Sequence, residues 1–323
     1  NMSTNRISLN FLAIQRFLES PLQGAARYRL GLKNNSSDRQ EEHESGEPLS
    51  MHRWTRKALL ESAFWDGNGE FEMMMLAYEK GFLRSTLAGK APVGPFAEVS
   101  HENDRAILRA WGENLSPFNL PSIDLWHRVR IGRGAEHAHA DVVLPALKLG
   151  KHFIEHAAEI ELHGHCLRMD PQGKTCLRLL MANKVEEKHF LPGFIQAVVL
   201  SASQQFHHPY IRVIAVPATT RIKTRFERYY RVPPPSDALD WLRTITTDLL
   251  TMPHDYRLPL EAVLKWKSER ERTPDAGFII RAGERTSDDY GPVENPQSFP
   301  VPTVSAAEKM IKRRFEYWFY AGS

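Results

Sequence analysis

Residues 161–203 constrain the fold of this chain more than any other stretch. They begin with side chains that alternate in period two, which is the pattern of a β-strand. Residues 170–173 (Asp-Pro-Gln-Gly) follow as a turn, because proline presets one backbone dihedral and glycine accepts a positive one. Residues 175–182 are mostly apolar, as in a strand buried on both faces, and Pro192 then precedes a helical apolar stripe. The stretch therefore predicts a strand, a turn, a second strand and a helix.

The composition is that of an ordinary globular protein. Of 323 residues, 42% are hydrophobic and 25% are charged, which excludes a disordered or fibrous chain. The formal net charge of +3 is too small to indicate a nucleic-acid partner by itself, so any such surface must be local. We expect no transmembrane helix, because no apolar run reaches about 18 residues. The two cysteines are too few for a disulfide scaffold, which predicts a reduced, cytoplasmic location.

The rest of the sequence predicts an α/β core with flanking helices. Helical periodicity covers residues 7–32 with a break at 20–21, and then residues 54–65, 71–83, 98–115, 237–252 and 305–320. Further strands are predicted at residues 123–131, 142–149, 211–216 and 221–231. Polar, turn-rich composition predicts loops at residues 33–48 and 272–302. We expect a helical N-terminal part at 1–118 and an α/β core with C-terminal helices at 119–323, or one continuous domain.

His163, His165, Cys166 and Cys176 carry atoms that can bind zinc, and all four lie in the two central strands. Alternation along a strand places His163 and His165 on one face and Cys166 on the other. A shared ion would therefore be awkward to hold. We expect ordinary packed or surface side chains, with no metal and no other cofactor.

A basic segment follows the central unit. Arg221, Lys223 and Arg225 share one face if the segment is a strand, and Arg228 and Arg231 lie just beyond. Aromatic residues are interleaved with these cations, and this combination suits the phosphates and bases of single-stranded DNA. The segment therefore predicts a DNA contact. The alternative is a solvated charged strand in which Glu227 is the partner.

The central unit has the layout of a metal-dependent nuclease without its acids. Such an enzyme needs carboxylates on adjacent strands to hold Mg²⁺, and a lysine two residues after the second carboxylate helps to position the attacking water. Here Lys184 is present, but Leu167 and Ala182 occupy the positions where the two carboxylates would be. Neutral side chains cannot hold a hard cation.

These motifs resemble those of exodeoxyribonuclease V gamma subunits, the RecC family, and more distantly the PD-(D/E)XK nuclease domains of the RecB and AddB type. LHGHCLRM is similar to the G-x-(I/L)-D-R motif, LLMANK to D-x-K, and IQAVVLSAS to Q-x-x-x-Y, in which Gln196 matches and Leu200 replaces the tyrosine. The resemblance covers nearly the whole chain and includes flanking segments at residues 7–32, 47–62, 91–99 and 238–260. An AddB assignment fits less well, because that family's nuclease domain binds an iron–sulfur cluster through four cysteines.

The resemblance implies an α/β fold with a PD-(D/E)XK, restriction-endonuclease-like mixed sheet and flanking helices. It implies an inactive nuclease-like domain that guides DNA strands or a duplex end and contacts RecB-like and RecD-like subunits in double-strand break repair and recombination. It also implies a pin that splits the duplex, for which residues 133–141 are the candidate loop.

Two other functions stay open from the sequence. One is a working metal nuclease with relocated carboxylates, for instance Asp170, Glu186 or Glu187 near Lys184. The other is a protein–protein scaffold without any DNA contact.

Overall fold

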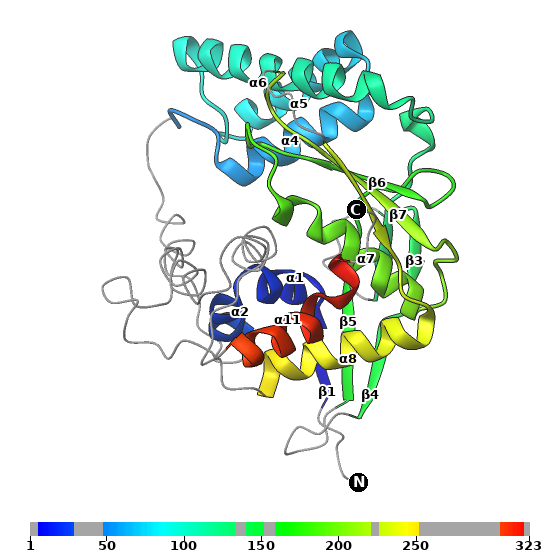
Figure 1. The fold of residues 1–323 in the computed structure, drawn as a ribbon. Coiled ribbons are helices and arrows are strands. Elements are labelled where there is room, and N and C mark those ends of the chain that lie inside the picture. Colours follow the sequence, from blue (N-terminus) through cyan, green and yellow to red (C-terminus); the bar gives the residue numbers. More distant parts are fainter. Residues whose placement is uncertain are drawn as a thin grey trace.

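The computed structural model describes residues 6–28, 48–132, 140–151, 159–220, 226–251 and 304–319, and its architecture is mixed α/β with two mixed sheets (Figure 1). The predicted α/β class is confirmed at this level. No described helix combines the length and the apolar character that a membrane crossing requires. The division at residue 118 stays a prediction.

The first sheet is built around β5 (Glu159–His165). The N-terminal strand β1 (Arg6–Asn10) pairs with it in parallel, and β4 (Leu147–Lys151) pairs with it in the antiparallel direction. The end of β5 pairs with β2 (Val129–Ile131), which in turn pairs with β3 (Val142–Leu144). Buried and partly exposed positions alternate along β5, so the predicted period-two pattern of this strand is confirmed.

The second sheet contains a β–α–β crossover. Strand β6 (Thr175–Leu179) runs parallel to β7 (Tyr210–Val216), and α7 (Leu191–Ala202) connects them. Strand β8 (Glu227–Arg231) adds to β7 in the antiparallel direction. The chain reaches β6 from β5 through the predicted turn, in which the amide of Gly173, at φ +70°, donates to the Asp170 carbonyl over 2.9 Å. The strand–turn–strand–helix prediction is thus confirmed in its order.

The second sheet separates two hydrophobic cores. Along β7, Val213 and Ala215 face one core while Ile214 and Val216 face the other. Helix α7 lies on the first side with α1, α8 and α11, and the helices α4, α5 and α6 cover the other side (Figure 1). These flanking helices are α1 (Leu12–Glu19), α2 (Pro21–Tyr28), α4 (Arg53–Asp66), α5 (Phe71–Leu87), α6 (Gly94–Leu115), α8 (Pro235–Thr251) and α11 (Val304–Phe319).

Several predicted boundaries are wrong. The helical pattern predicted from residue 7 begins too early, because residues 6–10 form β1. The predicted strand at 123–131 is extended only in Val129–Ile131, since Ile123–Leu125 forms a 3-10 turn. The predicted strand at 142–149 splits at Pro145, which has no amide hydrogen for a ladder. Strands β5 and β6 end earlier than predicted. Most of the loops expected at 33–48 and 272–302, and most of the candidate pin, lie outside the described residues.

Candidate functional site

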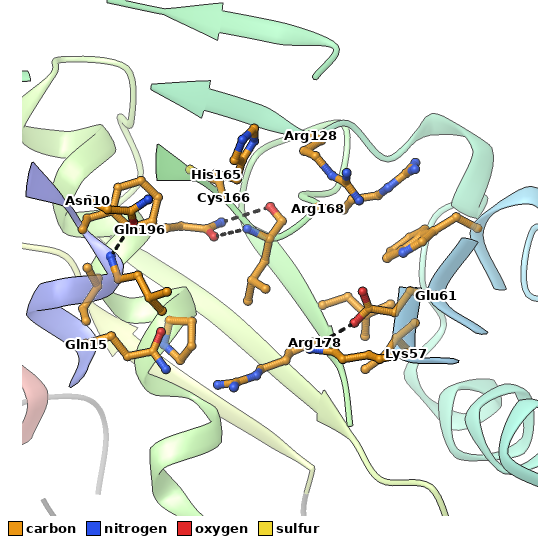
Figure 2. A pocket seen from close by; sticks show the side chains of 18 residues that line it. Asn10, Gln15, Lys57, Glu61, Arg128, His165, Cys166, Arg168, Arg178 and Gln196 are labelled. Atoms are coloured by element: carbon orange, nitrogen blue, oxygen red, sulfur yellow. Dashed lines mark hydrogen bonds and ion pairs between the residues drawn. The ribbon is translucent and has the colours of Figure 1, made fainter. Parts of the chain in front are cut away.

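A pocket of about 380 Å³ lies where the chain crosses from the first sheet to the second. Its walls come from α1, α4, the segment after β5, strand β6 and the start of α7 (Figure 2). The segment from Cys166 to Asp170, which contains Leu167, bridges the two sheets at this point. Met169 pairs with His127 on one side and with Cys176 on the other.

Two of the predicted motif residues meet in this pocket. Gln196, on α7, is only 1% exposed. Its Oε1 accepts a hydrogen bond of 2.7 Å from the backbone amide of Leu167, and its Nε2 donates to the Leu167 carbonyl over 3.5 Å (Figure 2). The amide side chain therefore fixes the backbone of the segment that carries Leu167.

Arg178 lies across the two strands from Leu167. Met169 pairs with Cys176, and the Leu177 amide donates to the Arg168 carbonyl over 3.2 Å. Continuing this antiparallel register places Arg178 opposite Leu167, and both residues line the pocket. The Arg178 Nη1 donates to the carbonyls of His189 and Lys188, over 3.0 and 3.4 Å, and burial lowers the pKa of its guanidinium.

Arg128 and Arg168 lie near each other at the other end of the pocket (Figure 2). The Arg168 guanidinium carbon is 4.6 Å from the centroid of the Trp65 ring. Burial lowers the pKa of Arg168, and the neighbouring Arg128 lowers it further. The pKa of His165 is also lowered, first by burial and then by the charges of Arg128 and Arg130.

Carboxylates are scarce in the pocket. Among the described residues that line it, only Glu61 is acidic, and it lies 3.6 Å from the Nζ of Lys57 one turn earlier on α4. Glu19 lies nearby on α1 and accepts a 2.7 Å hydrogen bond from Gln15. Burial raises the pKa of Glu19 although Arg178 opposes this shift.

Two further residues of the predicted motifs, Ala182 and Lys184, lie apart from Leu167 and Gln196. Ala182 and Lys184 follow the end of β6, are exposed and do not line the pocket. The carbonyl of Ala182 accepts a hydrogen bond of 3.0 Å from the Ala218 amide.

The three relocated-carboxylate candidates are engaged elsewhere. Asp170 accepts a 2.7 Å bond from the Lys174 amide within the turn. Glu186 pairs with Lys188 at 2.7 Å, and Glu187 pairs with Arg228 at 2.6 Å. Over the part of the chain that the structure describes, no three His, Cys, Asp or Glu side chains form a group that could hold a metal ion. Cys166 and Cys176 are buried thiols, and burial raises the pKa of Cys166 to about 12.

The predicted basic segment is described only in part. Arg221, Lys223 and Arg225 lie outside the described residues. Arg228 is occupied, because it binds Glu187 and its guanidinium carbon lies 5.1 Å from the Phe190 ring centroid. Arg231 is exposed at the end of β8.

Sequence reasoning identified Arg168 through the motif that resembles G-x-(I/L)-D-R, but it missed Arg128 and Arg178. Arg178 carries the only charge in an otherwise apolar strand, and that isolated charge was the available signal. Arg128 had no such signal, because its place depends on pairing between distant strands. No protein-family model matches this chain, and no curated protein shows significant similarity to it.

Proposed function

We propose that this protein is a non-catalytic module of a RecBCD-type helicase–nuclease that guides DNA strands and contacts other subunits. On this proposal, its core is a PD-(D/E)XK scaffold without metal-binding carboxylates, acting in double-strand break repair and recombination in the cytoplasm. The β4 and β5 pair, the bridge from Met169 to Cys176 and the β6–α7–β7 crossover support such a scaffold.

The composition of the pocket carries the proposal. Leu167 occupies the position where a metal nuclease would carry its first carboxylate, and across the bridged strands it lies opposite the cationic Arg178. Additional cations and a single lining carboxylate surround them. A pocket of this kind attracts phosphate without the ligands that Mg²⁺ requires.

An apolar stripe on α5 supports the subunit contact. Met73, Leu76, Leu83 and Leu87 are all exposed, with Leu87 at 81%, and their spacing places them along one side of the helix. Exposed apolar patches of this kind mark protein–protein contacts. Leu76→Glu with Leu83→Glu should weaken co-purification with a RecB-like subunit, whereas the exposed Lys174→Glu should not.

A cleavage assay tests the absence of catalysis. We expect the purified chain to leave single-stranded and duplex DNA intact in Mg²⁺ or Mn²⁺. The proposal would be overturned if the chain cuts DNA, if Lys184→Ala abolishes the cutting, and if the exposed Lys174→Ala leaves it unchanged. That result would favour a nuclease with relocated carboxylates.

A binding assay tests the guiding role. We expect forked DNA to bind in a salt-sensitive manner and the triple variant Arg221→Gln, Lys223→Gln, Arg225→Gln to bind it more weakly. Fluorescence anisotropy over a salt series measures both effects. Complete absence of binding would instead favour a protein–protein scaffold.

A further inference from the structure

The pocket at Leu167 concentrates positive charge. Four cations line it, namely Lys57, Arg128, Arg168 and Arg178. Lys57 is paired with Glu61, but no ion pair joins any of the three arginines to a carboxylate within the described ranges. The arginines therefore leave a positive field inside a concave, partly buried space, where charges act more strongly than in bulk water.

Arg168 has unused hydrogen-bonding capacity. Its Nε is buried and has no hydrogen-bond partner among the described residues. The Arg168 guanidinium carbon lies over the Trp65 ring, 4.6 Å from its centroid, so the N–H groups at the edge of the guanidinium can meet a planar or tetrahedral anion. Arg168 is only partly buried, but its unpartnered Nε–H group and its uncompensated charge in a concave site favour an anionic ligand.

The nearest carboxylates do not fill this role. The charges of Asp141 and Asp66 raise the pKa of Arg168, but neither carboxylate forms an ion pair with it. Asp141 accepts a 2.7 Å bond from the backbone amide of Arg128, and Asp66 accepts a 3.0 Å bond from the Ser62 hydroxyl.

We propose that Arg128 and Arg168 bind a backbone phosphate of a DNA strand in this pocket, with Arg178 supplying further positive charge. Guanidinium groups match the oxygens of a phosphate and supply directly the positive charge that a nuclease takes from its metal ion. The inference rests on the proposed DNA-guiding function and makes it specific, since it names the point where the strand is held. The strand is held there without being cut, because no carboxylate pair at the site positions a metal-activated water.

The test is binding of a fluorescent oligothymidylate with a 5′-hydroxyl end to the full chain. Arg128→Gln and Arg168→Gln should each weaken binding about tenfold and reduce the salt slope by about 0.7, which corresponds to one lost phosphate contact. The matched control is Arg84→Gln, an exposed arginine on α5, which should change the affinity less than about twofold.

The source of the phosphate is tested with matched ligands. An oligothymidylate with neutral methylphosphonate linkages should bind equally to wild type and to Arg168→Gln. If the variants weaken only the binding of a 5′-phosphorylated strand or of inorganic phosphate, the site takes a terminal or free phosphate and the inference is overturned.

Labelling of the unmutated chain avoids any folding defect of the variants. The oligothymidylate should protect Arg128 and Arg168, but not Arg84, from phenylglyoxal, as read by mass spectrometry. If the wild type binds DNA but the pocket variants behave like Arg84→Gln and the labelling shows no protection, this inference fails while the guiding role stands. If the wild type binds no DNA, both fail.

Discussion

Gln196 shows at the residue scale how the pocket keeps its shape. It is buried, and its Oε1 is the hydrogen-bond acceptor of the Leu167 amide at 2.7 Å. Removing it leaves a partly buried N–H group without a partner, and such a group costs about 1–3 kcal/mol. We therefore expect Gln196→Ala to lower the free energy of unfolding by about that amount, as measured by urea denaturation.

The control for this variant is Gln172→Ala, because Gln172 is exposed in the turn before β6. Its replacement should change the free energy of unfolding by less than about 0.5 kcal/mol. Equal effects of the two substitutions would show that the Gln196–Leu167 contact does not hold the segment.

His189 makes stability depend on pH. Burial, followed by the nearby Arg178, lowers the pKa of His189 from 6.5 to about 4, and its Nδ1 accepts a 2.9 Å bond from the Glu186 amide. Protonation is thus easier in the unfolded chain, so this contribution is fully present above pH about 6.5 and is lost as the pH falls toward 4. We expect a loss of roughly 1–3 kcal/mol across this window from His189 alone.

His189→Asn isolates this contribution. Asparagine keeps an acceptor but does not titrate, so the variant should lose less stability than the wild type between the two pH values. Urea denaturation at a series of pH values measures the difference, with the exposed His207→Asn as control. A wild-type profile that His189→Asn leaves unchanged would contradict the prediction.

The individual motif positions were predictable only in part. Leu167 and Gln196 were identified from the motifs in the sequence, and in the structure hydrogen bonds join the two residues. The cation opposite Leu167 was not predicted, because the register between two strands is set by pairing and not by the local sequence. A one-residue difference in register changes which side chain faces the pocket.

At the scale of elements, α7 packs closely on the β6–β7 pair because its first turn contains glycine. A Cβ added to Gly193 would lie 2.6 Å from the Cys176 Sγ and 2.7 Å from both methyl carbons of Val213. These are side chains of a buried sheet and have little room to move. We expect Gly193→Ala to destabilise the protein by about 1–3 kcal/mol in thermal or urea unfolding.

Gly112 in α6 provides a control, because its replacement by alanine should change the stability in the opposite direction. A Cβ there would meet its nearest neighbours, the Gly69 carbonyl oxygen and the Met74 methyl carbon, at an ordinary 3.5 Å. Alanine should therefore stabilise this helix by about 0.5–1 kcal/mol, because it restricts the unfolded chain. If both alanine variants shift stability in the same direction, close packing of α7 is not the reason.

Element types followed from sequence periodicity where an element is long. The helices α4, α5, α6, α8 and α11 were all expected near their observed places, because each has an apolar face repeated over several turns. Strand β1 was missed, since its five residues gain their partner from β5, far along the chain. Short strands of this kind carry too few residues for a clear period.

At the scale of the whole molecule, polar as well as apolar contacts attach α6 to the second sheet. The indole Nε1 of Trp111, on α6, donates to the Leu180 carbonyl over 3.1 Å just after β6. Asn114 on the same helix donates to the carbonyls of Pro217 and Thr219 beyond β7. No local pattern predicts these bonds, because they link the ends of strands to a helix far away in the sequence.

A buried charge attaches α11 to α8. Asp248 is fully buried on α8 and accepts bonds from Arg313 Nε and Nη2, at 3.0 and 2.8 Å, and from Arg314 Nε at 3.5 Å. Arg314 is only 2% exposed, and its guanidinium carbon lies 4.7 Å from the ring centroid of Phe17 on α1. The aspartate thus joins three helices around one ionic group.

Asp248→Asn leaves the Arg314 cation buried without a counter-charge, which costs about 3–5 kcal/mol. The control is Asp240→Asn on the same helix, whose side chain is 72% exposed and pairs with Arg243 at 2.9 Å. Loss of that surface pair should cost less than about 1 kcal/mol, because water screens it. Urea unfolding of both variants measures the contrast, and a small effect at Asp248 would mean that apolar packing of Ile311, Phe315 and Trp318 holds α11 without the ionic group.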